Sequence, residues 1–439
     1  MRSCMKTHTF FLALLALPCF VWGQATPTAS VQPATTSGMN FPAINGNYQY
    51  GLTVAEVIQS GYSNNGTNAS TSLSGDLAYT SKSELHPSSL IYAGGFQFGN
   101  YSGSSVTYFQ SLATSQSYIT RSWVFSLSDS LSYLPQSPTV GLSGIPGTGD
   151  LGLNPVQSGL EPSQNILSIG NSRISNSVSG SVERRLDAFT SVSGGASYGT
   201  LGFFGNGGLG SSQISASVGI NRRLDARSSA SLSATYGIFK FGSLGNGASF
   251  ATRGLSASYQ RQLSRSLSAS VSGGPEHISS SSVLGIPSRL TYTAGAGLSY
   301  AVRIYNASLS YSRAINGGGG VQPGGISDSV VGILQRPFGT AWSASANIGY
   351  SRTQGLSNTP TPVSLALLGV TTTGNYDGVF AGGQVSRRIS RSLSAYGSYT
   401  ALTQSYTLTQ VSPVALNGIV QSFAIGVSYF PRSLHLGQF

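Results

Sequence analysis

Apolar and small polar residues alternate with a period of two along most of the chain. The segment 230–238 carries Ala, Leu, Ala, Tyr and Ile at its even positions and Ser, Ser, Thr and Gly at its odd positions. The segments 342–350 and 423–429 repeat the pattern, with Trp342, Ile348 and Tyr350, then Phe423 and Tyr429, on the apolar side. Because successive side chains of a strand point to opposite faces, this alternation predicts β-strands with one apolar and one polar face.

Basic residues interrupt the alternation at regular places. RRLDA occurs at 184–188 and 222–226, RQLSR at 261–265 and RRISR at 387–391, and single cations stand in comparable positions at Lys82, Arg121, Arg303 and Arg336. Neighbouring motifs lie about 40 residues apart, which two strands of about 10 residues and one longer loop would fill. The segments between them, such as 353–375, are long and rich in Gly, Ser, Thr and Pro. About eight short connections, with both chain ends on the same side, predict about 18 strands within a range of about 14 to 18.

Strands of this kind would aggregate if their edges stayed open, and a closed barrel has no edges. The sequence therefore predicts an all-β fold. The predicted architecture is a transmembrane antiparallel up-and-down β-barrel, with short periplasmic turns and long extracellular loops.

The composition supports an outer surface that does not face water. Only 8% of the 439 residues are charged, against about 25% in a typical soluble domain. Disorder is a poor alternative, because the chain has 22 Tyr and 19 Phe and disordered chains are poor in aromatic residues. Only the first 23 residues approach the run of about 20 apolar residues that a transmembrane helix needs.

The chain divides into four parts. Residues 1–23 have the form of a signal peptide, with Arg2 and Lys6 before an apolar run and a small-residue cleavage site. Both cysteines, Cys4 and Cys19, lie within it, so we expect no disulfide, thiolate metal site or cysteine nucleophile in the mature chain. Residues 24–46 are predicted to be a flexible periplasmic lead, 47–430 the barrel, and 431–439 a C-terminal tail.

Over 47–430 the chain resembles bacterial outer-membrane β-barrel proteins of the porin-like kind. The last full strand, 419–430, ends in Tyr429 and Phe430, similar to the aromatic-terminated strand that the barrel-assembly machinery recognises. The resemblance implies export to the cell outer membrane and a passive diffusion channel for small polar or anionic solutes, without a cofactor. The alternative is an occluded barrel that acts as a surface adhesin or structural outer-membrane protein through its long loops. A secreted β-solenoid is disfavoured, because the spacing of the motifs is not fixed.

Several catalytic patterns occur and are discounted. Two GxGxxG matches, at 147–152 and 205–210, and one GxSxG match, at 195–199, are not followed by the helix that each site requires. Glu276 and His277 form the one adjacent acid–histidine pair, but no second carboxylate lies nearby for general acid–base work. We therefore expect no enzyme activity and no metal site. The cations are dispersed instead of clustered, which argues against nucleic-acid binding despite the net charge of +11.

The parity of the strands assigns directions to several cations. Arg173 and Arg289 are predicted to point into the lumen near the outer mouth, where they would favour anions. The apolar stripes continue into cations that we expect to face outward at the long-loop rim and to contact lipopolysaccharide phosphates, or else to be solvated there. These four cations are Lys240, Arg253, Arg313 and Arg352.

Asp129 does not fit the scheme, because it falls on the lipid-facing parity. On the next strand Asn176 lies between Ile174 and Val178 on the same parity. A carboxylate facing the bilayer core is unfavourable. We expect either a β-bulge that shifts the register, which we favour, or a contact with another subunit, as in trimeric porins.

Overall fold

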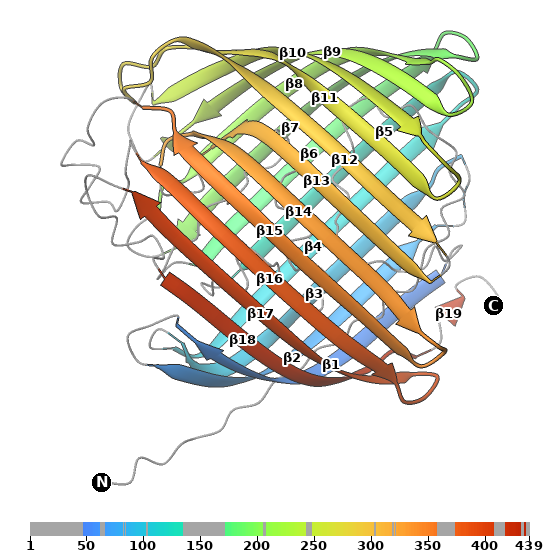
Figure 1. The fold of residues 1–439 in the computed structure, drawn as a ribbon, viewed down its shortest axis with the longest axis vertical. Coiled ribbons are helices and arrows are strands. Elements are labelled where there is room, and N and C mark those ends of the chain that lie inside the picture. Colours follow the sequence, from blue (N-terminus) through green and yellow to red (C-terminus); the bar gives the residue numbers. More distant parts are fainter. Residues whose placement is uncertain are drawn as a thin grey trace.

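The computed structural model describes residues 47–61, 66–81, 83, 85–101, 104–134, 172–204, 208–242, 248–302, 304–317, 320, 322–357, 374–407, 418–431 and 434–435. Eighteen long strands and one short strand form a single antiparallel sheet (Figure 1). The strands are β1 (Asn47–Ser60), β2 (Thr67–Thr80), β3 (Ser88–Tyr101), β4 (Ser104–Ile119), β5 (Trp123–Leu134), β6 (Ser172–Arg185), β7 (Thr190–Phe204), β8 (Ser211–Arg223), β9 (Ser228–Lys240), β10 (Ser249–Gln262), β11 (Leu267–Ile278), β12 (Arg289–Val302), β13 (Tyr305–Asn316), β14 (Gly325–Phe338), β15 (Trp342–Gly355), β16 (Asn375–Arg388), β17 (Leu393–Thr407), β18 (Gly418–Tyr429) and β19 (Leu434–His435).

The sheet closes on itself into a barrel. Each strand from β2 to β17 pairs with its two neighbours in the sequence, and β1 pairs with β18 from Leu52 opposite Tyr429 to Ser60 opposite Gln421. The short strand β19 adds a pairing at the start of β1, with Asn47 opposite His435. The sequence prediction of a closed antiparallel barrel with 18 strands is confirmed.

The connections differ at the two rims of the barrel. Eight short turns follow the even-numbered strands from β2 to β16, and they gather at the right-hand rim in Figure 1, where β19 also lies. We call this the short-turn rim and the opposite one the long-loop rim. The first arginine of each repeated motif lies inside a strand, and Arg336 lies within β14 instead of in a turn. Lys82 and Arg303 are outside the described residues.

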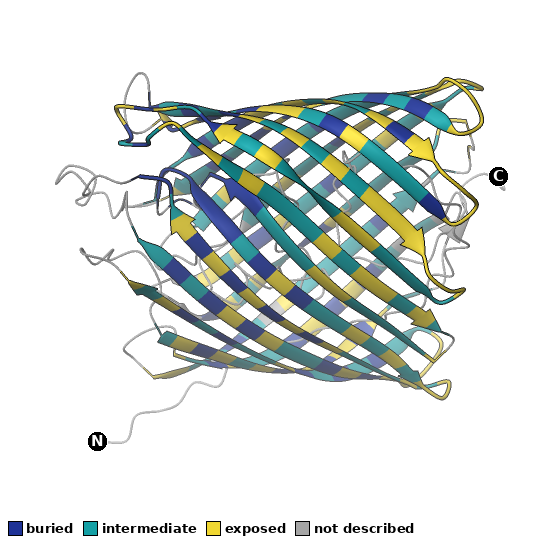
Figure 2. Cartoon of the chain, turned by 45° about the horizontal axis from the view of Figure 1, so that its top comes forward, coloured by how far each residue is buried: buried dark blue, intermediate teal, exposed yellow. Residues whose placement is uncertain are grey.

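The two faces of the wall have opposite chemistry. Leu232, Ile348 and Ile425 point outward, and 54%, 61% and 55% of their surfaces are exposed. Many inward positions between such residues are small and polar, as at Ser233 and Ser428, which are buried. Figure 2 shows the alternation of exposed and buried positions along the strands. No helix in the described part of the chain is long and apolar enough to cross a membrane.

Asp129 faces outward without a bulge, so the bulge that we favoured is wrong. The pairing of β5 runs without a shift on both sides, from Gln110 opposite Tyr133 on β4 and from Trp123 opposite Arg184 on β6. The amide nitrogen of Asn176 donates a hydrogen bond of 2.8 Å to the Asp129 carboxylate. The two polar groups that the register places on the outer face therefore satisfy part of each other's hydrogen-bonding capacity.

Candidate functional site: the inner wall and the long-loop mouth

Paired hydroxyl groups line the inside of the barrel. Serine recurs at inward positions on neighbouring strands, and directly opposite serines share hydrogen bonds between their hydroxyl groups. The Oγ–Oγ distances are 2.6 to 2.7 Å in the pairs Ser89–Ser115, Ser128–Ser179, Ser132–Ser175, Ser197–Ser215, Ser231–Ser258 and Ser343–Ser386. Because a hydroxyl is both donor and acceptor, each pair keeps further capacity for a water or a polar solute. The wall is therefore polar and mostly uncharged.

Charged groups on the inner face lie toward the two rims. Arg173 lies opposite Leu134 and Phe203, and Arg289 opposite the inward Ile278, so both occupy inward register positions at the long-loop end. The structure does not bring them together, since five strands separate β6 from β12. On the described strands, inward positions hold more cations than carboxylates: Arg173, Arg185, Arg223, Arg289 and Arg388 against Asp76, Glu183 and Glu276.

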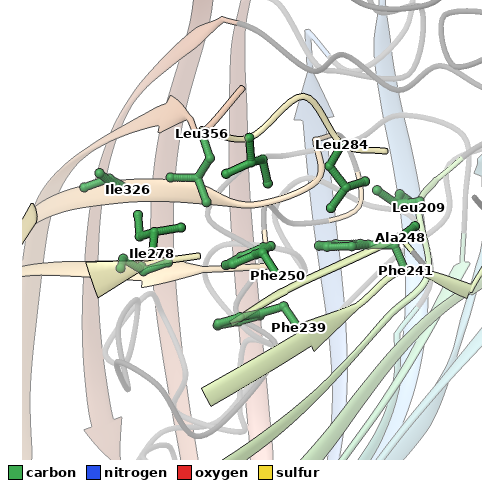
Figure 3. Packing of buried hydrophobic residues seen from close by; sticks show 11 residues of the cluster. Leu209, Phe239, Phe241, Ala248, Phe250, Ile278, Leu284, Ile326 and Leu356 are labelled. Atoms are coloured by element: carbon green, nitrogen blue, oxygen red, sulfur yellow. The ribbon is translucent and has the colours of Figure 1, made fainter. Parts of the chain in front are cut away.

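Apolar side chains fill part of the long-loop mouth, which the sequence analysis missed. Phe239 and Phe250 are directly opposite on the inward faces of β9 and β10, with ring centroids 4.7 Å apart. Phe241 continues the stack at 6.1 Å from Phe250 (Figure 3). We call the full set the mouth cluster, and all its members are at most 5% exposed: Leu209, Phe239, Phe241, Ala248, Phe250, Ile278, Leu284, Ile286, Ile315, Ile326 and Leu356.

The mouth cluster joins connections that start far apart on the barrel. The amide of Leu209, in the connection after β7, donates a 2.7 Å hydrogen bond to the carbonyl of Gly320, in the connection after β13. Gly320 has a φ of +82°, and a Cβ there would overlap the ring of Phe203. Ser357, after β15, donates to the carbonyl of Gly285, after β11. Over this arc, the packed side chains and the hydrogen-bonded backbone of these connections cover part of the long-loop mouth.

One sequence signal for the mouth cluster was present. The inward stripe of β9 runs Ser231, Ser233, Thr235, Gly237 and then turns aromatic at Phe239. A polar stripe that becomes apolar at the loop end indicates that something packs there. The residues from the connections, Leu284 and Leu356 among them, carry no comparable periodic signal.

Two of the four predicted outward cations have carboxylate partners. Arg313, Asp328, Arg352 and Asp377 lie directly opposite one another on β13 to β16 and form a ladder of alternating charge. Arg313 lies 2.7 Å from Asp328, and Arg352 lies 3.9 Å from Asp377. Tyrosines two residues before each arginine also donate to these aspartates, with Tyr311 at 2.9 Å and Tyr350 at 2.7 Å. Neither aspartate was predicted as a partner from the sequence, because cross-strand partners depend on register.

The other two outward cations are exposed and lack an acidic partner within the described part of the chain. Lys240 ends β9, and Arg253 lies on β10 with its guanidinium 5.7 Å from the centre of the Tyr236 ring. Both lie at the long-loop rim, on the face that carries Leu232 and Leu255. Contact of the four cations with lipopolysaccharide stays a prediction, and these contacts support it best for Lys240 and Arg253.

Within the described residues, the GxSxG match and the Glu276–His277 pair are ordinary strand residues. Ser197 is an inward strand residue that shares its hydrogen bond with Ser215. Glu276 and His277 point to opposite faces of β11, and the imidazole of His277 bonds to Ser288 at 3.0 Å. Among the described residues there is no group of three or more metal-ligating side chains. The match at 147–152 and the first part of the match at 205–210 lie outside the described residues.

Comparison with known proteins finds similar barrels at low identity. No family model matches the chain, and no curated protein matches it. Among solved structures, OccK2 (OpdF) of Pseudomonas aeruginosa has a TM-score of 0.44 and 10% identity, covering 89% of this chain and 98% of its own. OpdK of Pseudomonas aeruginosa with vanillate has a TM-score of 0.41 and 8% identity, with coverages of 88% and 99%. The siderophore receptor PirA of Pseudomonas aeruginosa has a TM-score of 0.42 and 8% identity, with coverages of 89% and 81%.

Proposed function

We propose that the chain forms an outer-membrane channel for passive diffusion of small polar solutes, with a modest preference for anions. The observation that carries this proposal is the closed wall of 18 strands, apolar outside and lined by paired hydroxyl groups inside. Barrels of 16 to 18 strands are wide enough to leave an aqueous channel. The apolar outer face suits acyl chains, and closure leaves no backbone edge to be satisfied there.

The selectivity of this channel follows from its inner charges. The hydroxyl wall offers hydrogen bonds without a fixed charge, so neutral polar solutes pass by exchanging water for serine. The excess of inward cations over carboxylates adds a weak attraction for anions. The mouth cluster sets an upper limit on solute size, because its side chains cover part of the opening.

Conductance in a planar bilayer tests the proposal. We expect defined single-channel conductance steps. In a salt gradient, the sign of the reversal potential should show that anions permeate more easily than cations. The double variant R173Q/R289Q should lower the anion preference, whereas E276Q should raise it. Absence of conductance from correctly folded protein would contradict an open channel and favour the occluded barrel. A cation preference would contradict the assignment of selectivity.

Three further expectations from the sequence stay predictions. They are cleavage of a signal peptide, recognition of the last strand with its terminal Tyr429 and Phe430 by the barrel-assembly machinery, and contact of the outward Asp129 with another subunit. The carboxylate of Glu56, at an outward position of β1 opposite Ile425, is another acidic group on the outer face that such a contact could cover.

A further inference from the structure

The short-turn rim carries a ring of outward arginines. They occupy equivalent positions near the ends of β6, β8, β10, β14 and β16, and all are exposed. Their outward direction follows from the register: Arg184 lies opposite the exposed Trp123, and Arg387 opposite the exposed Trp342. We call these residues the arginine belt: Arg184, Arg222, Arg261, Arg336 and Arg387.

Aromatic rings hold three of these side chains against the wall. The guanidinium carbons of Arg184 and Arg387 lie 5.2 Å from the ring centres of Trp123 and Trp342. That of Arg336 lies 4.8 Å from the ring centre of Phe338. Stacking on a ring leaves the N–H groups of a guanidinium free to bind an anion in the plane of the group. These three arginines therefore lie beside aromatic side chains at the rim, and their N–H groups are available to bind an anion.

The same turn presents four of the arginines. Each turn continues as Arg, any residue, Leu or Ile, then Asp or Ser, and the fourth residue accepts hydrogen bonds from backbone amides of its turn. The third residue is an aliphatic side chain that is half exposed: Leu186 at 54%, Leu224 at 55%, Leu263 at 50% and Ile389 at 57%. A long basic side chain beside an exposed aliphatic group suits a membrane interface, where the apolar part is buried and the charge reaches the headgroups.

The belt arginines differ from Arg313 and Arg352 of the long-loop rim in their acidic partners. At the long-loop rim Arg313 and Arg352 are paired with aspartates. No carboxylate of the described residues lies within ion-pair distance of a belt arginine. Asp187 and Asp225 interact with Arg222 and Arg261 at longer range, but they cap their own turns by accepting from the amides of Phe189 and Arg227. The charge of the belt is therefore open to an external anion.

We propose that the arginine belt binds the phosphate headgroups of anionic phospholipids, such as phosphatidylglycerol, in the leaflet at the short-turn rim. This inference rests on the proposed function, which places the barrel in a membrane. Guanidinium groups bind phosphate through charge-assisted, bidentate hydrogen bonds. The exposed Leu and Ile of the turns contact the glycerol and upper acyl region of the same lipids. The ladder at the opposite rim has no such surplus of positive charge.

Tryptophan fluorescence provides a direct measurement. The chain has three Trp, and Trp123 and Trp342 both stack on belt arginines. In the mature chain expected after cleavage of residues 1–23, which removes Trp22, quenching by brominated phosphatidylglycerol and by brominated phosphatidylcholine in vesicles therefore reports the lipid beside the belt. We expect the wild-type rim to prefer phosphatidylglycerol by at least about tenfold at low salt. A basic residue near an anionic surface contributes roughly fivefold to lipid affinity, so R184Q/R222Q/R387Q, which leaves Arg261 and Arg336 in place, should lower the preference at least about fivefold.

The matched control changes the same turns on the other face. Arg185, Arg223 and Arg388 directly follow three belt arginines and occupy inward positions, with Arg185 and Arg388 opposite the buried Ser191 and Ser394. The variant R185Q/R223Q/R388Q removes the same net charge and should keep the lipid preference.

Three results would overturn the proposal that the arginine belt binds anionic phospholipids. They are equal quenching by the two lipids in the wild type, an unchanged preference in the belt variant, and an equal loss of preference in both variants. Absence of quenching by either lipid would instead contradict membrane insertion and with it the proposed function. Conductance of the same samples, which the belt variant should keep, separates the two failures.

Discussion

Phe250 is the residue through which the width of the mouth can be tested. It is 2% exposed, stacks on Phe239 and Phe241, and lies against Gly324 in the connection after β13. The change F250A removes the ring that links the wall of β10 to that connection. We expect the barrel to stay closed, because alanine at this position can make the same backbone hydrogen bonds between strands as Phe250.

The magnitude follows from the burial. Truncation of a fully buried Phe to Ala costs about 3–5 kcal/mol, the lower end applying where neighbours can collapse into the space. Each 1.4 kcal/mol is a factor of ten, so about 3 kcal/mol changes the ratio of undocked to docked connections by about 100-fold. We therefore expect F250A channels to show a second, larger conductance level and to admit larger polyethylene glycols than the wild type.

A substitution on the opposite face provides the control. Leu255 lies on the same strand and is 55% exposed on the outer face, so L255A should leave conductance and size exclusion unchanged. Folding of each variant is verified by circular dichroism. An F250A channel with wild-type conductance and wild-type size exclusion would refute the conclusion that the mouth cluster narrows the opening.

Two further predictions concern the outer face and the turns. The change N176V leaves the Asp129 carboxylate without its amide donor and should destabilise the barrel by about 1–3 kcal/mol, whereas D129V/N176V should restore stability. Urea unfolding in vesicles measures the stability of both variants. An unchanged stability of N176V would contradict the pairing of Asp129 with Asn176. The amides of Phe189 and Thr190 donate to Asp187 and hold the pKa of its carboxyl below its usual value. Its stabilising contribution is therefore complete above the unfolded-state pKa and is lost as pH falls through the lower folded-state pKa, so D187A should flatten the acid side of a profile of unfolding temperature against pH; an unaltered profile would oppose this assignment.

The local pattern was sufficient to predict the wall. A period of two fixes which side chains share a face, and Ile348 and Ser343 lie on opposite faces as expected. The short basic turns mark every second connection, so counting them gives the number of strands. Both signals are local in sequence, and tertiary packing does not reverse them, because a shift of one residue would place every serine in lipid.

The features that were missed depend on contacts between distant segments. The partner of Arg352 is Asp377, across a long connection whose length does not reveal the register. The contact of Leu209 with Gly320 joins connections that the sequence separates by more than four strands. The bulge assigned to Asp129 was wrong for a related reason: a polar outward position can be satisfied by a neighbour such as Asn176 without any change of register.

Because Leu52 of β1 pairs with Tyr429 of β18, the first long strand has its second partner only when the last long strand is present. Without this pairing the sheet has two open edges, whose backbone N–H and C=O groups lack partners. A chain that ends before β18 would keep both edges open, so we expect it to form no smaller working barrel.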